Sequence, residues 1–416
     1  MSDARRYTTA LESAFGSSTI GLRSSPWCGG RDVVHLKPTS IDCVPDVLKW
    51  ASAHDVAVIP TGSCLEPRVS ASGDDHPLIL DLSPCRRVVE YSVEDLVLTA
   101  ECGLTLEAAA QITAAHGHTI PLTPPFPARA TLGGVVARGA EGMTAATYGR
   151  VRDHVLGLRI AHADGRITHC GGRVVKNVTG YDLVRLAVGS RGTLGVILEV
   201  TLRLLPTESD RCGVLAGFPT VAGAVDAAMR LRDSYPTLHA ITILPRTLLP
   251  HPTEEPVALL VSLRGEPEYT AAMKQDLLRE LPEGAVPCAD PIPMSSPWDE
   301  VLRGGLTIAA LPSRCGALLA EILTAREPGF PYVLDILSGC MRLAPPELTR
   351  FEDEERTLAP LLSRHEAYGE RGGDPTFHAR RARVFPEQKW DGLSLMSSIA
   401  KTLDPAGILM RGRRDF

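Results

Sequence analysis

The chain has 416 residues, of which 44% are apolar and 22% are charged, and its net charge is −6. This length suffices for two domains or one large domain, and the acidic balance gives no indication of a nucleic-acid partner. The longest apolar runs, such as Val257–Leu263, are far shorter than the roughly 20 residues of a membrane-spanning helix. The N-terminus has no apolar signal-peptide core, so the sequence predicts a cytoplasmic protein without direct membrane insertion.

The first half of the chain alternates strands with helices. We expect a strand over 33–36, a helix beginning at Pro45, which suits a first helical turn, and a strand over 56–59. The loop that follows leads through a polar stretch into a strand over 78–82 and not into a helix. A Rossmann nicotinamide site, in which a glycine loop enters a helix, is therefore disfavoured.

Further strands are predicted over 88–92, 97–101 and 196–204, and a helix over 105–116. Residues 155–170 indicate a β-hairpin, with Asp164-Gly165 as a type I′ turn. These elements predict an α+β domain and exclude a helical bundle.

After residue 207 helical patterns become more frequent, with strands predicted over 257–263 and 332–337. The helices are expected near 221–234, 269–280, 313–326, 346–366 and 388–403. We interpret this half as a second, cap-like domain. The predicted organisation is 1–207, with subdomains of about 33–94 and 95–207, followed by 208–416.

Cysteine spacing excludes several cofactors. The ten cysteines include no CxxC pair, so the spacing of iron–sulfur and structural zinc sites is absent and buried, reduced thiols are expected. The sequence also has no HExxH, GxSxG or GKS/GKT motif, which disfavours zinc proteases, serine hydrolases and P-loop proteins. No metal site is predicted.

Glycine-containing segments occur at 60–65, 130–149 and 171–197. Glycines let backbone N–H groups converge and approach a ligand closely. Each segment alone is better explained by a tight turn than by a ligand site. Three of them within 140 residues, none at the start of a predicted helix, favour a long and extended cofactor.

The run from Val33 to Pro206 resembles the FAD-binding domain of the vanillyl-alcohol oxidase / p-cresol methylhydroxylase (PCMH) superfamily. Within it the chain is most similar to the flavin subunits of glycolate oxidase or dehydrogenase. The resemblance rests on ATLGGVVA at 130–137, YGRVRDHVLGLRIAHADGRI at 148–167, GGRVVKNVTGYDL at 171–183 and VGSRGTLGVILEVTLRLLP at 188–206. It implies an α+β fold of two FAD-binding subdomains and an α+β cap, with the C-terminal segment 403–409 returning to the FAD domain.

The resemblance also assigns residues to FAD. The implied contacts are Pro60, Thr61, Gly62, Ser63, Cys64 and Leu65 in a first pyrophosphate loop, Thr131, Leu132, Gly133, Gly134 and Ala137 in a second, Gly142, Tyr148 and Gly149 around the flavin, Lys176 and Asn177 in a turn beside it, and Gly192, Gly195, Val196 and Ile197 along a ring edge. The first loop has fewer glycines than the family pattern, and residues 410–412 read Met-Arg-Gly where the family has Asn-Pro-Gly.

Asn177, the one asparagine in the sequence, has two interpretations. With Lys176 it could donate hydrogen bonds to the flavin or its phosphates, or it could simply occupy a left-handed turn. Tyr181-Asp182 is more simply read as the cap of a following helix.

Three function hypotheses follow from the resemblance. The first is a flavin subunit of a glycolate (2-hydroxy-acid) oxidase complex, with a second flavin subunit and an iron–sulfur subunit as partners. The alternatives are a stand-alone FAD-dependent alcohol or hydroxy-acid dehydrogenase and a non-catalytic scaffold. The catalytic residues stay unassigned, because each cationic candidate in the cap is also explained by a surface or core role: Arg342, His365, His378, Arg380, Arg381 and Arg383.

Overall fold

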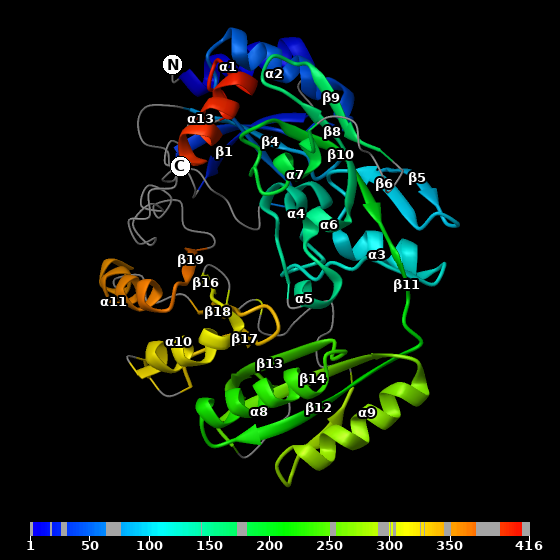
Figure 1. The fold of residues 1–416 in the computed structure, drawn as a ribbon. Helices are drawn as coiled ribbons and strands as arrows, with labels where there is room; N and C mark the ends of the chain where they lie inside the picture. Colours follow the sequence, from blue (N-terminus) through cyan, green and yellow to red (C-terminus); the bar gives the residue numbers. More distant parts are fainter. Residues whose placement is uncertain are drawn as a thin grey trace.

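The computed structural model of the chain describes residues 3–16, 19–25, 31–63, 76–142, 144–172, 181–249, 255–289, 299, 301–302, 305–324, 326–327, 329–344, 351–371 and 392–409. Strands within these ranges form sheets of four, five and eight strands and one two-stranded pair (Figure 1). Helices accompany each of the three larger sheets, so the predicted α+β class is confirmed. No helix in the described ranges has the length and apolar character needed to cross a membrane.

The four-stranded sheet forms the N-terminal part of the fold, with strand order β1-β2-β4-β3. Strands β2, β4 and β3 are parallel, and helix α2 carries the predicted proline in its first turn and buries Val47, Leu48 and Ala51. The elements are α1 (Asp3–Phe15), β1 (Ile20–Ser25), β2 (Arg31–Leu36), η3 (Ile41–Cys43), α2 (Val44–Ala53), β3 (Val58–Thr61) and β4 (Leu78–Asp81).

The second sheet is antiparallel, with strand order β5-β6-β10-β8-β9. Its strands are β5 (Val88–Ser92), β6 (Val97–Glu101), β8 (Val155–Ala161), β9 (Ile167–Gly171) and β10 (Val196–Arg203), and β7 (His118–Thr119) pairs separately with β11 (Leu205–Pro206). The helices of this region are α3 (Leu106–Ala114), α4 (Leu132–Arg138), α5 (Ala145–Tyr148), α6 (Val151–His154) and α7 (Leu183–Ala187). Asp182 caps α7 by accepting a hydrogen bond from the backbone N of Arg185, as predicted.

Two local predictions were wrong. The β8–β9 turn is not type I′, because Gly165 has a positive φ of 78° whereas Asp164 does not. The backbone N of Gly165 donates to His162 O, and the N of His162 donates to Arg166 O. This pattern is typical of a three-residue hairpin loop, in which a type I turn is followed by a glycine in the left-handed conformation. The glycine segment after Thr131 was expected to be a pyrophosphate loop that does not start a helix, but it forms helix α4, since the Thr131 side chain accepts a hydrogen bond from the N of Gly134 and caps the helix.

The third sheet is antiparallel and has the order β15-β12-β14-β13-β17-β18-β16-β19. Its strands are β12 (Asp210–Phe218), β13 (Ala240–Pro245), β14 (Val257–Gly265), β15 (Val286–Cys288), β16 (Leu306–Ala309), β17 (Tyr332–Asp335), β18 (Cys340–Leu343) and β19 (Tyr368–Arg371). The helices are α8 (Val221–Ser234), η4 (Arg246–Leu248), α9 (Pro267–Glu280), α10 (Pro312–Thr324) and α11 (Phe351–Arg364). Helices α8 to α11 share a core with one face of the sheet.

The C-terminal segment packs against the N-terminal sheet. Helix α13 (Gly392–Leu403) lies beside the N-terminal elements in Figure 1. The backbone N of Val58, at the start of β3, donates to Ile408 O at 2.9 Å, and Ile408 and Leu409 belong to the core that spans 11–204. A second core spans 214–367. The domain boundary at 207/208 stays a proposal.

Candidate flavin site

One cavity lies between the end of β3, the start of α4 and the segment that leads into β10. It is open to solvent on one side and is lined by Pro60, Thr61, Gly62, Leu82, Cys102, Thr131, Gly133, Gly134, Ala137, Arg191, Gly192, Gly195, Val196 and Ile197. The fold thus brings together three segments that are far apart in the sequence.

Strand β3 presents the first of these segments. Thr61 pairs with Asp81 in the parallel register of β3 and β4, and its carbonyl accepts the N of Leu82 at 2.8 Å. The Thr61 hydroxyl is buried and has no hydrogen-bond partner among the residues that the structure describes. A buried hydroxyl without a partner costs free energy, so this atom provides a polar contact that a bound ligand can satisfy.

Helix α4 presents the second segment at close range. The backbone N of Gly133 donates to Cys102 O at 2.8 Å, and a Cβ atom at Gly133 would lie 2.6 Å from Cys102 Cβ. A Cβ atom at Gly62 would overlap the Thr131 hydroxyl. Glycine at both positions therefore allows the β3 loop (residues 60–63), helix α4 and the segment at Cys102 to lie in direct contact.

The third segment turns sharply before β10. Gly192 has a φ of 78° and Gly195 a φ of 153°, where a side chain is disfavoured. A Cβ atom at Gly195 would also overlap Ile160 on the neighbouring strand β8. These glycines let Val196 and Ile197 start the strand at the cavity wall.

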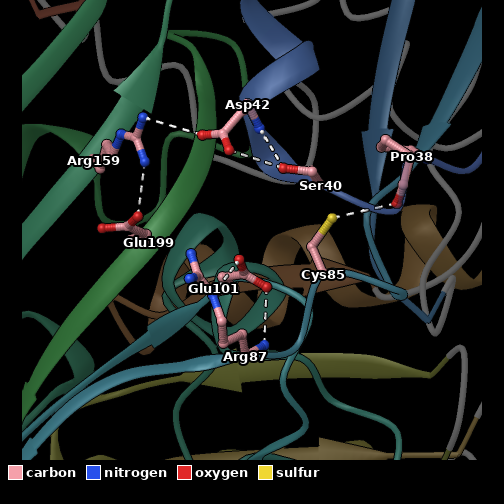
Figure 2. Close-up of polar contacts among 8 residues, drawn as sticks. All are labelled: Pro38, Ser40, Asp42, Cys85, Arg87, Glu101, Arg159 and Glu199. Atoms are coloured by element: carbon pink, nitrogen blue, oxygen red, sulfur yellow. Dashed lines mark hydrogen bonds and ion pairs between the residues drawn. The ribbon is translucent and has the colours of Figure 1, made fainter. Parts of the chain in front are cut away.

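Polar contacts accompany the two sheets near their junction. Figure 2 shows Arg159 of β8 between Glu199 of β10, at 2.8 Å, and Asp42 of η3, at 3.7 Å. The Cys85 thiol, in the segment between β4 and β5, donates to Pro38 O, in the segment after β2, at 3.4 Å. Of these contacts, the Arg159–Asp42 pair connects the region of the first sheet to the second sheet.

The structure separates the residues predicted from sequence into three groups. Those in the cavity are Pro60, Thr61, Gly62, Thr131, Gly133, Gly134, Ala137, Gly192, Gly195, Val196 and Ile197. Ser63 and Leu132 do not line it, Gly142 and Gly149 line a smaller separate cavity, and Tyr148 contacts the cap. Cys64, Leu65, Lys176 and Asn177 lie outside the described residues, as do His378, Arg380, Arg381 and Arg383.

Sequence reasoning missed three lining residues, Leu82, Cys102 and Arg191. Cys102 is buried, and burial raises the pKa of its thiol. Arg191 lies in the GSRGTLG motif on which the resemblance rests, so it could have been predicted as a cavity residue from the sequence. Leu82 and Cys102 had no such signal, because only the packing of their loops brings them to the cavity.

Tyr148 connects α5 to the cap sheet. Its hydroxyl donates to Glu208 and accepts from Arg264 Nη1 at 3.2 Å, and its ring lies 4.9 Å from the His239 ring. Burial and the Glu208 hydrogen bond raise the pKa of Tyr148 to about 12. These contacts assign Tyr148 to the junction between the two halves of the chain.

His239 makes this junction sensitive to acid. Burial, reinforced by Arg264, lowers the pKa of His239 to about 3, whereas the unfolded residue titrates near about 6.5. Its contribution to stability is therefore complete above about pH 6.5 and is lost as the pH falls toward about 3. Between about pH 7 and pH 5 we expect wild-type protein to lose about 2 kcal/mol of unfolding free energy that a His239→Gln variant does not lose. Denaturant titrations at both pH values measure this difference.

The exposed His116 supplies the control for this comparison. A His116→Gln variant should keep the wild-type pH dependence. An identical pH dependence of wild-type protein and the His239→Gln variant would contradict the assignment.

Two of the cap candidates have partners in the structure. Arg342 of β18 pairs with Asp299 at 2.9 Å, and Asp299 also accepts the backbone N of Phe126 at 3.1 Å. His365 lies 2.9 Å from Glu321, on the helical side of the cap. Arg138, at the end of α4, lies near Arg342, and burial together with Arg342 lowers the pKa of Arg138 to about 10.

Comparison with known proteins identifies the cofactor of the chain. Residues 34–171 match a family described as an FAD binding domain. This part of the chain is an FAD-binding domain. The resemblance seen in the sequence is confirmed, and FAD is the cofactor.

Several proteins of known name are similar to the chain. It is 32% identical over 200 residues to a D-lactate dehydrogenase of Archaeoglobus fulgidus, which covers 48% of this chain and 44% of that protein. It is 30% identical over 313 residues to glycolate oxidase subunit GlcD of Bacillus subtilis, covering 74% and 62%. It is 44% identical over 131 residues to glycolate oxidase subunit GlcE of Escherichia coli, covering 30% and 37%. The matches thus span between about a third and three fifths of these relatives.

A solved alkyldihydroxyacetonephosphate synthase has a similar fold. The TM-score is 0.67 at 16% identity, over 93% of this chain and 78% of that one. At this identity the likeness shows the fold alone.

The residues of the FAD-binding domain fit the cofactor. A diphosphate flanked by two ring systems needs close backbone approach and polar contacts. The glycines at 62, 133, 134, 192 and 195, together with the Thr61 hydroxyl, provide both along one cavity. We propose that the cavity residues named above hold FAD.

Proposed function

We propose that the chain is the flavin subunit of a glycolate (2-hydroxy-acid) oxidase or dehydrogenase complex in the cytoplasm. The observation that carries the proposal is an FAD-binding domain with sequence similarity to both GlcD and GlcE. FAD supplies the hydride acceptor for oxidation of an alcohol carbon when it is bound. Because the ten cysteines of this sequence include no CxxC pair, we propose that a separate iron–sulfur subunit accepts the electrons.

A cationic junction between the FAD-binding domain and the cap supports an acidic substrate. On β18, Met341 and Leu343 belong to the core that helices α8 to α11 share with one face of the sheet. Arg342 stands between them in the strand and therefore points to the opposite face of the sheet. Asp299 links Arg342 to Phe126 of the FAD-binding domain, and Arg138 lies close to Arg342. Guanidinium groups such as these two suit the recognition of a substrate carboxylate.

Reconstitution tests the proposal. The purified chain incubated with FAD should show a visible flavin absorption band, and lack of the band would refute it. Dye-linked oxidation of glycolate, D-lactate and D-2-hydroxyglutarate should require the partner subunits. Turnover by the isolated chain would select the stand-alone dehydrogenase. Full complex activity with a Gly133→Asp, Gly134→Asp variant that lacks FAD would select the scaffold.

An Arg138→Gln variant tests the cationic junction. We expect the KM for the hydroxy acid to rise about tenfold, because one charge-assisted hydrogen bond to the carboxylate is lost. Flavin content should be unchanged, since Arg138 does not line the flavin cavity. Steady-state kinetics of the reconstituted complex measure the effect, with Arg185→Gln, on an arginine that is 60% exposed, as the control. An unchanged KM would remove Arg138 from the substrate site.

A further inference from the structure

The wall of the flavin cavity carries its charge at one position. Among the lining residues that the structure describes, Arg191 alone has a charged side chain, and the others are glycine, apolar, threonine or cysteine residues. FAD carries its negative charge on the diphosphate. An anion that enters such a neutral cavity loses hydration and needs a compensating cation.

The backbone holds Arg191 in a disfavoured conformation. Its φ is 58°, in the left-handed region, between Gly189 at 82° and Gly192 at 78°. Left-handed conformation is unfavourable for a residue with a Cβ atom, and such residues concentrate at functional sites. A glycine would adopt this φ without strain, so local backbone geometry does not explain the arginine.

Hydrogen bonds fix this turn to helix α4. The backbone N of Arg191 donates to Ala137 O at 2.6 Å, and the N of Gly189 donates to Val136 O at 3.0 Å. Gly133, Gly134 and Ala137 of the same helix line the cavity. The Arg191 backbone is therefore positioned directly against the helix that lines the cofactor cavity.

We propose that Arg191 pairs with the diphosphate of FAD. Its guanidinium donates charge-assisted hydrogen bonds to phosphate oxygens, a role that its planar group of donors suits. The proposal requires only that the chain binds FAD and is independent of the substrate proposed above.

Ligand titrations of the apoprotein test the proposal without measuring activity. For Arg191→Gln we expect the dissociation constant of FAD to rise about tenfold to a hundredfold, and that of ADP to rise similarly. Riboflavin, which has no phosphate, should bind as it does to wild-type protein. Arg191→Lys should lose less than Arg191→Gln, because it keeps the charge. Unchanged FAD and ADP binding would overturn the proposal, and so would an equal loss for riboflavin.

An Arg191→Gly variant separates binding from folding. Because glycine accepts the left-handed φ, we expect the apoprotein of this variant to melt at or above the wild-type temperature and to lose as much FAD affinity as is expected for Arg191→Gln. A lower melting temperature with unchanged FAD affinity would show that Arg191 is a structural residue and would overturn the proposal. Arg129→Gln, on an exposed arginine of the same domain, should match wild-type protein in every measurement.

Discussion

A Gly62→Ala variant is expected to bind FAD about tenfold to a hundredfold more weakly than wild-type protein. The added Cβ atom would overlap the Thr131 hydroxyl, which lies directly against Gly62 at the cavity wall. Thr131 caps α4 through the N of Gly134, at 3.2 Å, so its displacement disturbs both the cavity and the helix start. Overpacking of this kind costs about 1–3 kcal/mol. Fluorescence titration of the apoprotein with FAD measures the loss.

Gly21→Ala is the matched control for this variant. Gly21 lies in β1, and no atom comes within 4 Å of its added Cβ. FAD affinity should therefore equal that of wild-type protein. If Gly62→Ala also bound FAD with wild-type affinity, the β3 loop would not be part of the flavin site.

An Asp404→Ala variant is expected to lose about 3 kcal/mol of unfolding free energy. The Asp404 side chain is 2% exposed and accepts the backbone N of Ile408 at 3.0 Å and of Leu409 at 2.7 Å. Hydrogen bonds to a charged group each contribute about 1.5–3 kcal/mol, and their loss leaves two buried N–H groups without this acceptor. The same turn supplies Ile408 O to the backbone N of Val58 at the start of β3, the strand that leads to Pro60 and Thr61. FAD affinity should fall with stability.

Denaturant unfolding measures this change in unfolding free energy. An Asp404→Asn variant is measured in the same way for comparison. Asparagine keeps one acceptor oxygen, so its loss should be intermediate. If Asp404→Ala instead unfolded at the wild-type denaturant concentration, the C-terminal turn would not stabilise the FAD-binding domain.

Sequence periodicity predicted elements that have one buried face. The helix over 221–234 has its predicted bounds in α8, where Ala224, Ala227 and Leu231 are buried on one face. Strand β13 was missed, whereas the equally buried β14 was predicted from its continuous apolar run. In β13 the apolar run is interrupted by Thr242 and ends at Pro245, so neither a continuous run nor an alternation marks it in the sequence.

The residues of the candidate site, too, could be predicted from the sequence only in part. Glycines of the 60–65, 130–137 and 189–197 segments could be identified from sequence, because backbone approach to a ligand restricts residue type directly. The position of Tyr148 away from the cavity could not be predicted from the sequence. Its interaction with Glu208 and Arg264 depends on how the cap sheet docks on α5, which no local pattern encodes.

The sequence by itself determined the α+β class, the order of most elements and, through the family resemblance that its motifs carry, the cofactor. Tertiary structure alone decided that Thr131 starts a helix and that Cys102 and Leu82 complete the cavity. The physical reason is the range of the interactions. Propensity and periodicity act within a few residues, whereas a cavity is formed by loops that meet only after the sheets have packed.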